Sequence, residues 1–256
     1  MSTMTALFII LALLLLIVGG KMGIQTIVSL VFNFFWLFLT ITLIAWGFSP
    51  LIVVTITGII ILAMTIFLSD DNDQVTRVAF ATGVVIMLIL IAIIVPVEHY
   101  AAVQGFANED SDALEGLSLN IGVNFLQITM VATILSTLGA IAEAAMAVAA
   151  GMQELISDNP DIPTNKLFGH GMHIGQQIIS TAINTLFFGF MGSFLGLSIW
   201  FIRLNYGFAD MINAKIFVSE FLLLIFSMIA VILAVPCTAW FMKLDLQRQN
   251  NSNHSD

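Results

Sequence analysis

Apolar stretches about as long as a lipid bilayer is thick recur along the whole chain. A helix needs roughly 20 apolar residues to cross the hydrocarbon core, because each residue adds about 1.5 Å. With 59% hydrophobic and 9% charged residues, the composition lies far outside the range of soluble domains. The sequence therefore predicts an all-α, polytopic transmembrane helix bundle of about seven spans, near residues 4–18, 24–46, 51–68, 78–97, 121–153, 168–202 and 214–242.

These spans are expected to form a single domain, residues 1–242, followed by a short polar cytoplasmic tail, residues 243–256. The first span is short enough to be compared with a signal peptide. No Lys or Arg precedes it, and it runs into Gly19, Gly20 and Lys21 rather than into a small-residue cleavage site. We therefore expect it to be a retained first span.

The distribution of Lys and Arg predicts the orientation in the membrane. With the N-terminus outside, the outer side receives Arg203 and Lys215, and the inner side receives Lys21, Arg77, Lys166, Lys243 and Arg248. This bias follows the positive-inside rule and places the C-terminus in the cytoplasm. The outer loop after the fourth span then carries Glu98, Glu109, Asp110, Asp112 and Glu115. Such a cluster could collect divalent cations, but a solvated loop is the expected role.

Several classes of function lack support in the sequence. The formal net charge of −9 gives no basic surface for nucleic acid, and the single Cys237 excludes a disulfide within the chain. There is no Walker A, G-x-S-x-G or H-E-x-x-H motif and no Cys/His metal pattern, so we expect no cofactor and no metal. Ser180 and His173 lie two helical turns apart, roughly 10 Å, which is too far for a nucleophile and its base. An enzyme is not expected.

Polar residues form a stripe on each of the two long spans that flank the polar turn at residues 157–166. A charge at the bilayer centre costs about 2.5–3.5 kcal/mol, and the predicted spans contain only two carboxylates, Glu143 and Glu220. Residues at helical spacing share one face of a helix. The fifth span carries the stripe Thr129, Thr133, Ser136, Ala140, Glu143 and Ala147, and the sixth carries His173, Gln177, Ser180 and Asn184 with Gln176 and Thr181 beside them.

The two stripes are expected to face each other across the turn. If the helices end near Glu154 and restart near Leu167, Glu143 lies roughly 16 Å from the turn, level with Gln177–Thr181. A side-chain amide and a hydroxyl of the sixth span could then hydrogen-bond the carboxyl of Glu143. The candidate polar pathway or ion site consists of Glu143, His173, Gln176, Gln177, Ser180, Thr181 and Asn184.

Helix packing is the alternative explanation for these polar residues. Polar side chains join membrane helices, and small residues let their backbones approach, as Gly171 with Gly175 and Gly192 with Gly196 would do. For Gln176, Gln177 and Asn184 packing and a ligand path stay open. For Glu143 the functional role is favoured, whereas His173 is expected to be an interfacial or structural residue. Glu220 lies close to the start of its span and is expected to reach the outer surface.

The central part of the chain resembles the YibE/F family of bacterial multi-pass membrane proteins. The resemblance lies in GAIAEAAMAVAAGMQELISDNPDIPTNKLFGHGMHIGQQIISTAINTLFFGFMGSFLG, residues 139–196, with weaker similarity at Gly20–Gly23 and at Val235-Pro236. It implies a multi-pass protein of the bacterial cytoplasmic membrane. By its length the chain is similar to the shorter of two typical members, which often occur as a pair.

The chain departs from the family pattern inside this block. The family usually has Asp where this chain has Glu143, which keeps the carboxyl. It usually has Asn in place of His173 and an Arg-Asp pair in place of Gln176-Gln177. Loss of that ion pair makes an ion-coupled role for this subunit less secure and fits a division of labour with a charged paralogue.

Two functions follow from these observations. The first is a transport-type subunit that moves a small solute or ion along the polar hairpin, with Glu143 as a proton or cation site. The second is a structural or regulatory membrane subunit that stabilises a partner complex through the same faces. The expected partners are the lipid bilayer and a longer paralogue of the family in a hetero-oligomer, or else a second copy in a homodimer.

Overall fold

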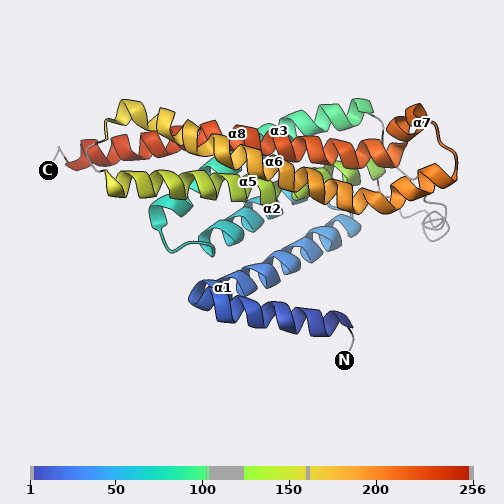
Figure 1. Ribbon diagram of the computed structural model, residues 1–256, viewed down its shortest axis with the longest axis horizontal. Helices are drawn as coiled ribbons and strands as arrows, with labels where there is room; N and C mark the ends of the chain where they lie inside the picture. Colours follow the sequence, from blue (N-terminus) through green and yellow to red (C-terminus); the bar gives the residue numbers. More distant parts are fainter. Residues whose placement is uncertain (1–2, 102, 104–123, 160–161, 254–256) are drawn as a thin grey trace.

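The computed structural model describes residues 3–101, 103, 124–159 and 162–253, and it contains helices and no strand in these ranges. Six helices of the described chain are long and apolar enough to cross a membrane. The all-α polytopic bundle is thereby confirmed. In chain order the helices are α1 (Thr3–Ala45), α2 (Pro50–Phe67), α3 (Asp73–Ala101), α5 (Phe125–Asp158), α6 (Thr164–Arg203), the short α7 (Phe208–Asn213) and α8 (Lys215–Asn253) (Figure 1).

Helix α1 contains both of the first two predicted spans. It is bent at Gly20, which has φ 52° and ψ −125°, a backbone conformation that glycine adopts without a steric penalty. The two legs of α1, before and after Gly20, run back in nearly opposite directions (Figure 1). An apolar hollow of about 570 Å³ lies between them, and Phe8, Leu11 and Phe34 help to line it. The seven predicted spans therefore become six helices, because a single residue rather than a loop separates the first two.

Helix α5 is the central element of the bundle. It packs most extensively against α3 and α8, and less extensively against α2 and α6. Their apolar residues form one large core, in which Val54, Ile86, Ile141 and Ala234 are fully buried. By contrast, α1 packs chiefly against α2 and stands beside the bundle (Figure 1).

The other helices differ from the predicted spans mainly at their ends. Helix α3 extends past 78–97 in both directions, and α8 continues through Pro236 and through residues predicted as a polar tail, as far as Asn253. Residues 121–123 of the fifth predicted span lie outside the described residues. Helix α7 was not predicted. It lies between α6 and α8 next to a cluster of aromatic side chains that includes Phe194, Phe201 and Tyr206.

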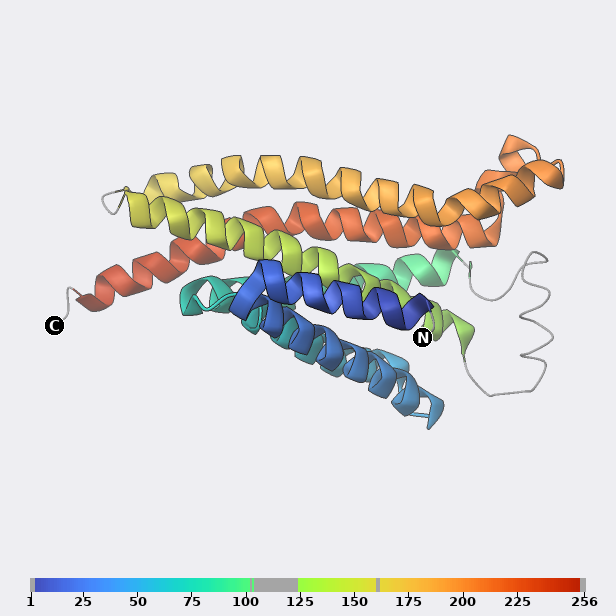
Figure 2. The same ribbon diagram turned by 60° about the horizontal axis from the view of Figure 1, so that its bottom comes forward.

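The connections between helices collect at two opposite ends of the bundle. The bend of α1, the α2–α3 and α5–α6 connections and the C-terminus lie at one end, and α7 lies at the other (Figures 1 and 2). By their positions in these elements, Lys21, Arg77, Lys166, Lys243 and Arg248 belong to the first end, and Arg203 and Lys215 to the second. The arrangement is compatible with the predicted orientation, which stays a prediction.

Candidate functional site

The predicted polar hairpin consists of α5 and the first half of α6. A Cβ atom built on Gly151 of α5 would lie 3.0 Å from Cγ2 of Ile174, and one built on Gly171 of α6 would lie 2.6 Å from Sδ of Met152. These two contacts fix the antiparallel register of the helices. Eight or nine residues further into the bundle, Glu143 lies level with residues 180–182, in the middle of both helices.

The polar side chains at this level point away from the bundle. Glu143 is exposed, and so are all six polar residues predicted on α6: His173, Gln176, Gln177, Ser180, Thr181 and Asn184. Glu143 makes no hydrogen bond or ion pair within the described part of the chain. The expected hydrogen bonds between Glu143 and α6 are therefore absent there, and this prediction was wrong. We call Glu143 together with these six residues the outward polar face.

Helix periodicity explains why the two stripes do not meet. On α6 the positions that point inward are taken by Gly171 and Gly175, and the polar residues occupy the other side of the same helix. On α5 the predicted stripe divides. Its buried members include Thr133 and Ala140, whereas Ser136 and Glu143 are exposed. At 100° per residue the six positions of the stripe stay within about 80° of one another around the helix axis. The boundary between the buried and the exposed side of α5 runs along this stripe and divides it.

Some of the polar groups of α6 are satisfied within their own helix. Thr181 Oγ1 donates to the carbonyl oxygen of Ile178 at 3.0 Å, and Asn184 Nδ2 donates to that of Ser180 at 2.9 Å. The carboxyl of Glu143 has no such partner. A charged group at the bilayer centre costs about 2.5–3.5 kcal/mol, and an unbonded amide also costs free energy in hydrocarbon. Chemically, this face is suited to contact with water or with polar groups of another protein.

The four glycines predicted to pack helices behave in two ways. A Cβ atom on Gly175 would lie 2.0 Å from Cγ1 of Val235, and one on Gly171 would lie 2.7 Å from Cβ of Ala239, so α6 and α8 approach closely there. No atom lies within 4 Å of the corresponding positions at Gly192 and Gly196, which are exposed. The second pair therefore packs against no described helix, and its packing role stays a prediction.

Glu220 of α8 lies in a pocket that is separate from the outward polar face. It is exposed and lines a pocket of about 280 Å³ between α6 and α8, together with Thr185, Ser193 and Ser227. The position, in the second turn of α8, is the one from which a side chain was expected to reach the outer surface. Of the two carboxylates predicted inside spans, neither is buried.

Among the described residues, the buried carboxyl is that of Glu98, which was predicted to lie in the outer loop. It belongs to the last turn of α3 and is 0% exposed. Thr133 Oγ1 of α5 donates to its Oε1 at 2.9 Å, and its Oε2 is buried without a hydrogen-bond partner in the described chain. The sequence carried a signal that was missed. Ile86, Leu90 and Ile94 precede Glu98 at intervals of four residues, on one inward stripe. The other four acidic residues of the predicted loop, Glu109, Asp110, Asp112 and Glu115, lie outside the described residues.

The comparison with protein families decides what kind of bundle this is. A family model described as YibE/F-like protein matches residues 7–248, nearly the whole chain. The chain belongs to the YibE/F-like family. No curated protein and no solved structure matched it. With its apolar helices, this YibE/F-like chain is a multi-pass membrane protein, and both Glu98 and the outward polar face lie within the matched range.

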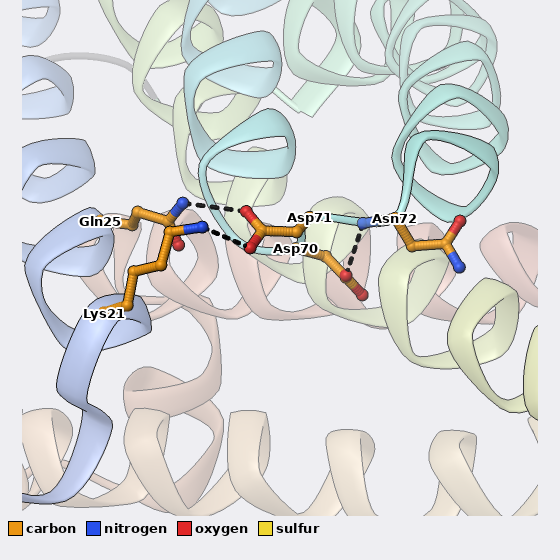
Figure 3. A network of polar contacts seen from close by, with 5 residues as sticks. All are labelled: Lys21, Gln25, Asp70, Asp71 and Asn72. Carbon is orange, nitrogen blue, oxygen red and sulfur yellow. Dashed lines mark hydrogen bonds and ion pairs between the residues drawn. The ribbon is translucent and has the colours of Figure 1, made fainter.

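A second polar network of the YibE/F-like chain joins α1 to the α2–α3 connection. Lys21 Nζ lies 2.8 Å from Asp71 Oδ2, and Gln25 Nε2 donates to Asp71 Oδ1 at 3.1 Å (Figure 3). The hydrogen bond from Lys21 holds the pKa of Asp71 below its ordinary value, and the bond from Gln25 adds to this. Both charged side chains are largely exposed, so the ion pair contributes little to stability. Along the same face of α1, Asn33 Nδ2 donates to Thr65 Oγ1 at 2.8 Å.

The described part of this YibE/F-like chain offers no cluster of metal ligands. No three His, Cys, Asp or Glu side chains come together in the described ranges. Cys237 is a partly buried free thiol packed against the core. Ser180 and His173 make no hydrogen bond to each other in this part of the chain.

Proposed function

We propose that this protein is a transport-type subunit in which a small solute or ion moves along the outward polar face. The observation that carries the proposal is the position of Glu143. Its carboxyl is exposed in the middle of α5, level with residues 180–182 of α6, where a lone chain would present it to lipid hydrocarbon. A path shared with a partner subunit would supply the water or polar groups that this face needs.

The proposal extends to the setting in which the subunit works. We place it in the bacterial cytoplasmic membrane with the N-terminus outside, in a hetero-oligomer with a longer paralogue of the family, or else in a homodimer. The charges support a different partner over a second copy. Every Lys and Arg lies near an end of a helix, next to the bend of α1 or in the polar end of α8, so a second copy brings no cation to the level of Glu143. We propose no enzymatic activity.

A membrane-impermeant thiol reagent tests whether water reaches this face. Single cysteines replace Glu143 or Asn184 in a Cys237→Ser background, with the protein in its native membrane. Ile56→Cys on exposed α2 is the lipid-facing control, and Ala145→Cys is the buried control. We expect the first two cysteines to react and both controls to stay protected. Protection of Glu143→Cys and Asn184→Cys from both sides of the membrane would overturn the transport proposal.

A structural or regulatory subunit is the second candidate function. Exposed small residues on α5 favour it. Ala132, Ser136 and Gly139 are exposed on the three turns that precede Glu143, and such small residues let another helix approach closely. Glu143→Gln discriminates between the two functions. As a proton or cation site, Glu143 cannot be replaced by Gln without loss of transport, whereas in a packing interface Gln keeps the hydrogen bonds and the complex persists.

A further inference from the structure

The carboxyl of Glu98 lies in surroundings that oppose a bare negative charge. It is 0% exposed, and only one of its two oxygens is hydrogen-bonded, by Thr133 Oγ1 at 2.9 Å. The other oxygen, Oε2, is buried and unbonded within the described chain. Removing a carboxylate oxygen from water without a compensating partner costs several kcal/mol.

The helix that carries Glu98 adds to this effect. Glu98 lies in the last turn of α3, which ends at Ala101. The last four carbonyl groups of a helix have no partner in the helix and give this end a partial negative charge. Acidic side chains are therefore disfavoured at a helix C-terminus, whereas a positive charge is favoured there.

Charged groups that could compensate Glu98 are absent from the described helices around it. Helices α2, α5 and α8 pack against α3. Helix α2 contains no titratable residue, and α5 contains none before Glu143. On α8 the nearest end carries Lys215 and Glu220, both exposed, and on α3 itself His99 and Tyr100 are exposed. None of them forms an ion pair with Glu98 in this part of the structure.

We propose that Glu98 is a binding site for a single positive charge, either a proton or a monovalent metal ion. The unbonded Oε2 receives this charge, and Thr133 holds the carboxyl in position through Oε1. A divalent metal does not suit the site, because hard divalent cations take several oxygen ligands and Glu98 is the one carboxylate there among the described residues. The site is separate from the outward polar face, because it lies inside the bundle at the other end of α3 from the α5–α6 connection.

The test measures the melting temperature of the purified full-length protein in detergent. In one series the pH changes at constant salt, and in the other Na⁺ or K⁺ replaces choline at constant pH and ionic strength. A ligand that binds only the folded state raises the melting temperature, by about 3–5 °C for each tenfold increase above its dissociation constant. If the ligand is a proton, we expect this rise with falling pH down to the ordinary glutamate pKa of about 4.3, because below it the unfolded chain binds the proton as well. If the ligand is a metal ion, we expect the rise with Na⁺ or K⁺.

Matched variants assign the effect to Glu98. Glu98→Gln should remove the dependence, and Glu220→Gln, which changes an exposed carboxyl on α8, should keep it. A wild-type melting temperature that responds to neither series would overturn the proposal, and so would a Glu98→Gln variant that responds like the wild type.

A second measurement on the wild-type protein decides the outcome if Glu98→Gln does not fold. An apolar carbodiimide modifies carboxyl groups that carry a proton, and peptide mass spectrometry locates the modified residue. Modification of Glu98 that decreases when the pH or the effective metal ion is raised would support the site. An unmodified Glu98, or modification that neither condition changes, would contradict it.

Discussion

The two Gly-x-x-x-Gly motifs of α6 have the same sequence pattern and opposite surroundings. Gly171 and Gly175 lie against α8, where added Cβ atoms would collide with Ala239 and Val235. Gly192 and Gly196 lie on the exposed side of α6, where an added Cβ atom would meet nothing of the neighbouring helices within 4 Å. A small residue permits a close approach of helices, but the rest of the packing decides whether a helix comes near. The same Gly-x-x-x-Gly pattern is therefore required by close packing at one place on α6, whereas no neighbouring helix requires it at the other.

The largest expected effect on stability comes from adding one methyl group at each of the two motifs. Gly175→Ala places a Cβ atom 2.0 Å from Cγ1 of Val235, so α6 and α8 have to move apart. We expect a loss of about 3 kcal/mol or more in the free energy of unfolding, the upper range for overpacking. Gly192→Ala meets no atom and should be neutral or stabilising by up to about 1 kcal/mol, from helix propensity. Denaturant unfolding in detergent measures both, and equal effects would remove the distinction.

A smaller effect is expected for the buried hydroxyl that contacts Glu98. Thr133→Val keeps the shape of the side chain and removes its donor, which leaves both carboxyl oxygens of Glu98 unbonded. We expect a loss of about 1–3 kcal/mol, the cost of an unsatisfied buried polar group. Thr181→Val on the outward side is the matched control, because its hydroxyl bonds to its own helix. A control as destabilised as Thr133→Val would show that the loss comes from the substitution itself.

The outward carboxyl should contribute almost nothing to the stability of the isolated chain. Glu143 has no partner within the described chain, so Glu143→Ala should change the free energy of unfolding of the purified subunit by less than about 0.5 kcal/mol. The effect should instead be seen as loss of transport or of co-purifying partner. Destabilisation of the isolated subunit by more than about 1 kcal/mol would indicate an internal contact of Glu143 that the structure does not show.

The smallest expected effect concerns the exposed network of Lys21 and Asp71. The pKa of Asp71 is lowered in the folded protein, so its contribution to stability is fully present above the ordinary aspartate pKa of about 3.9. It is lost as the pH falls through the lower, folded value. Wild type and Asp71→Asn should therefore differ slightly in melting temperature at neutral pH and converge in acid. Asp70→Asn, which removes a carboxyl outside the Lys21 contact, should keep the pH dependence of the wild type.

Much of the fold was predictable from the sequence, because apolar length alone decides where a membrane helix forms. The segments 51–68 and 168–202 match α2 and α6 within a few residues. The helix ends were harder, since polar residues such as those after Met242 can extend a helix beyond the bilayer. The short helix α7 carries no apolar signal of the length that marks a span.

The candidate site was only partly predictable, because the direction in which a side chain points depends on tertiary packing. The polar residues of α6 were correctly placed on one helical stripe, but the glycines beside them set the other side of α6 against α8. Glu98 was not among the predicted buried residues because the predicted span stops at Val97, whereas α3 continues to Ala101. Glu98 follows the buried Ile94 by four residues and so lies on the same face of α3. A buried carboxyl at this position is predictable once the helix is extended beyond Val97.

The bend at Gly20 has a consequence for the lipids around α1. The leg before Gly20 starts at Thr3 and so spans about 25 Å at 1.5 Å per residue, whereas a typical hydrocarbon core is about 30 Å thick. A segment that is too short thins the bilayer at a cost of fractions of a kcal/mol per ångström. Membrane thickness therefore acts directly on α1, and thinner membranes accommodate this leg with less deformation than thicker ones.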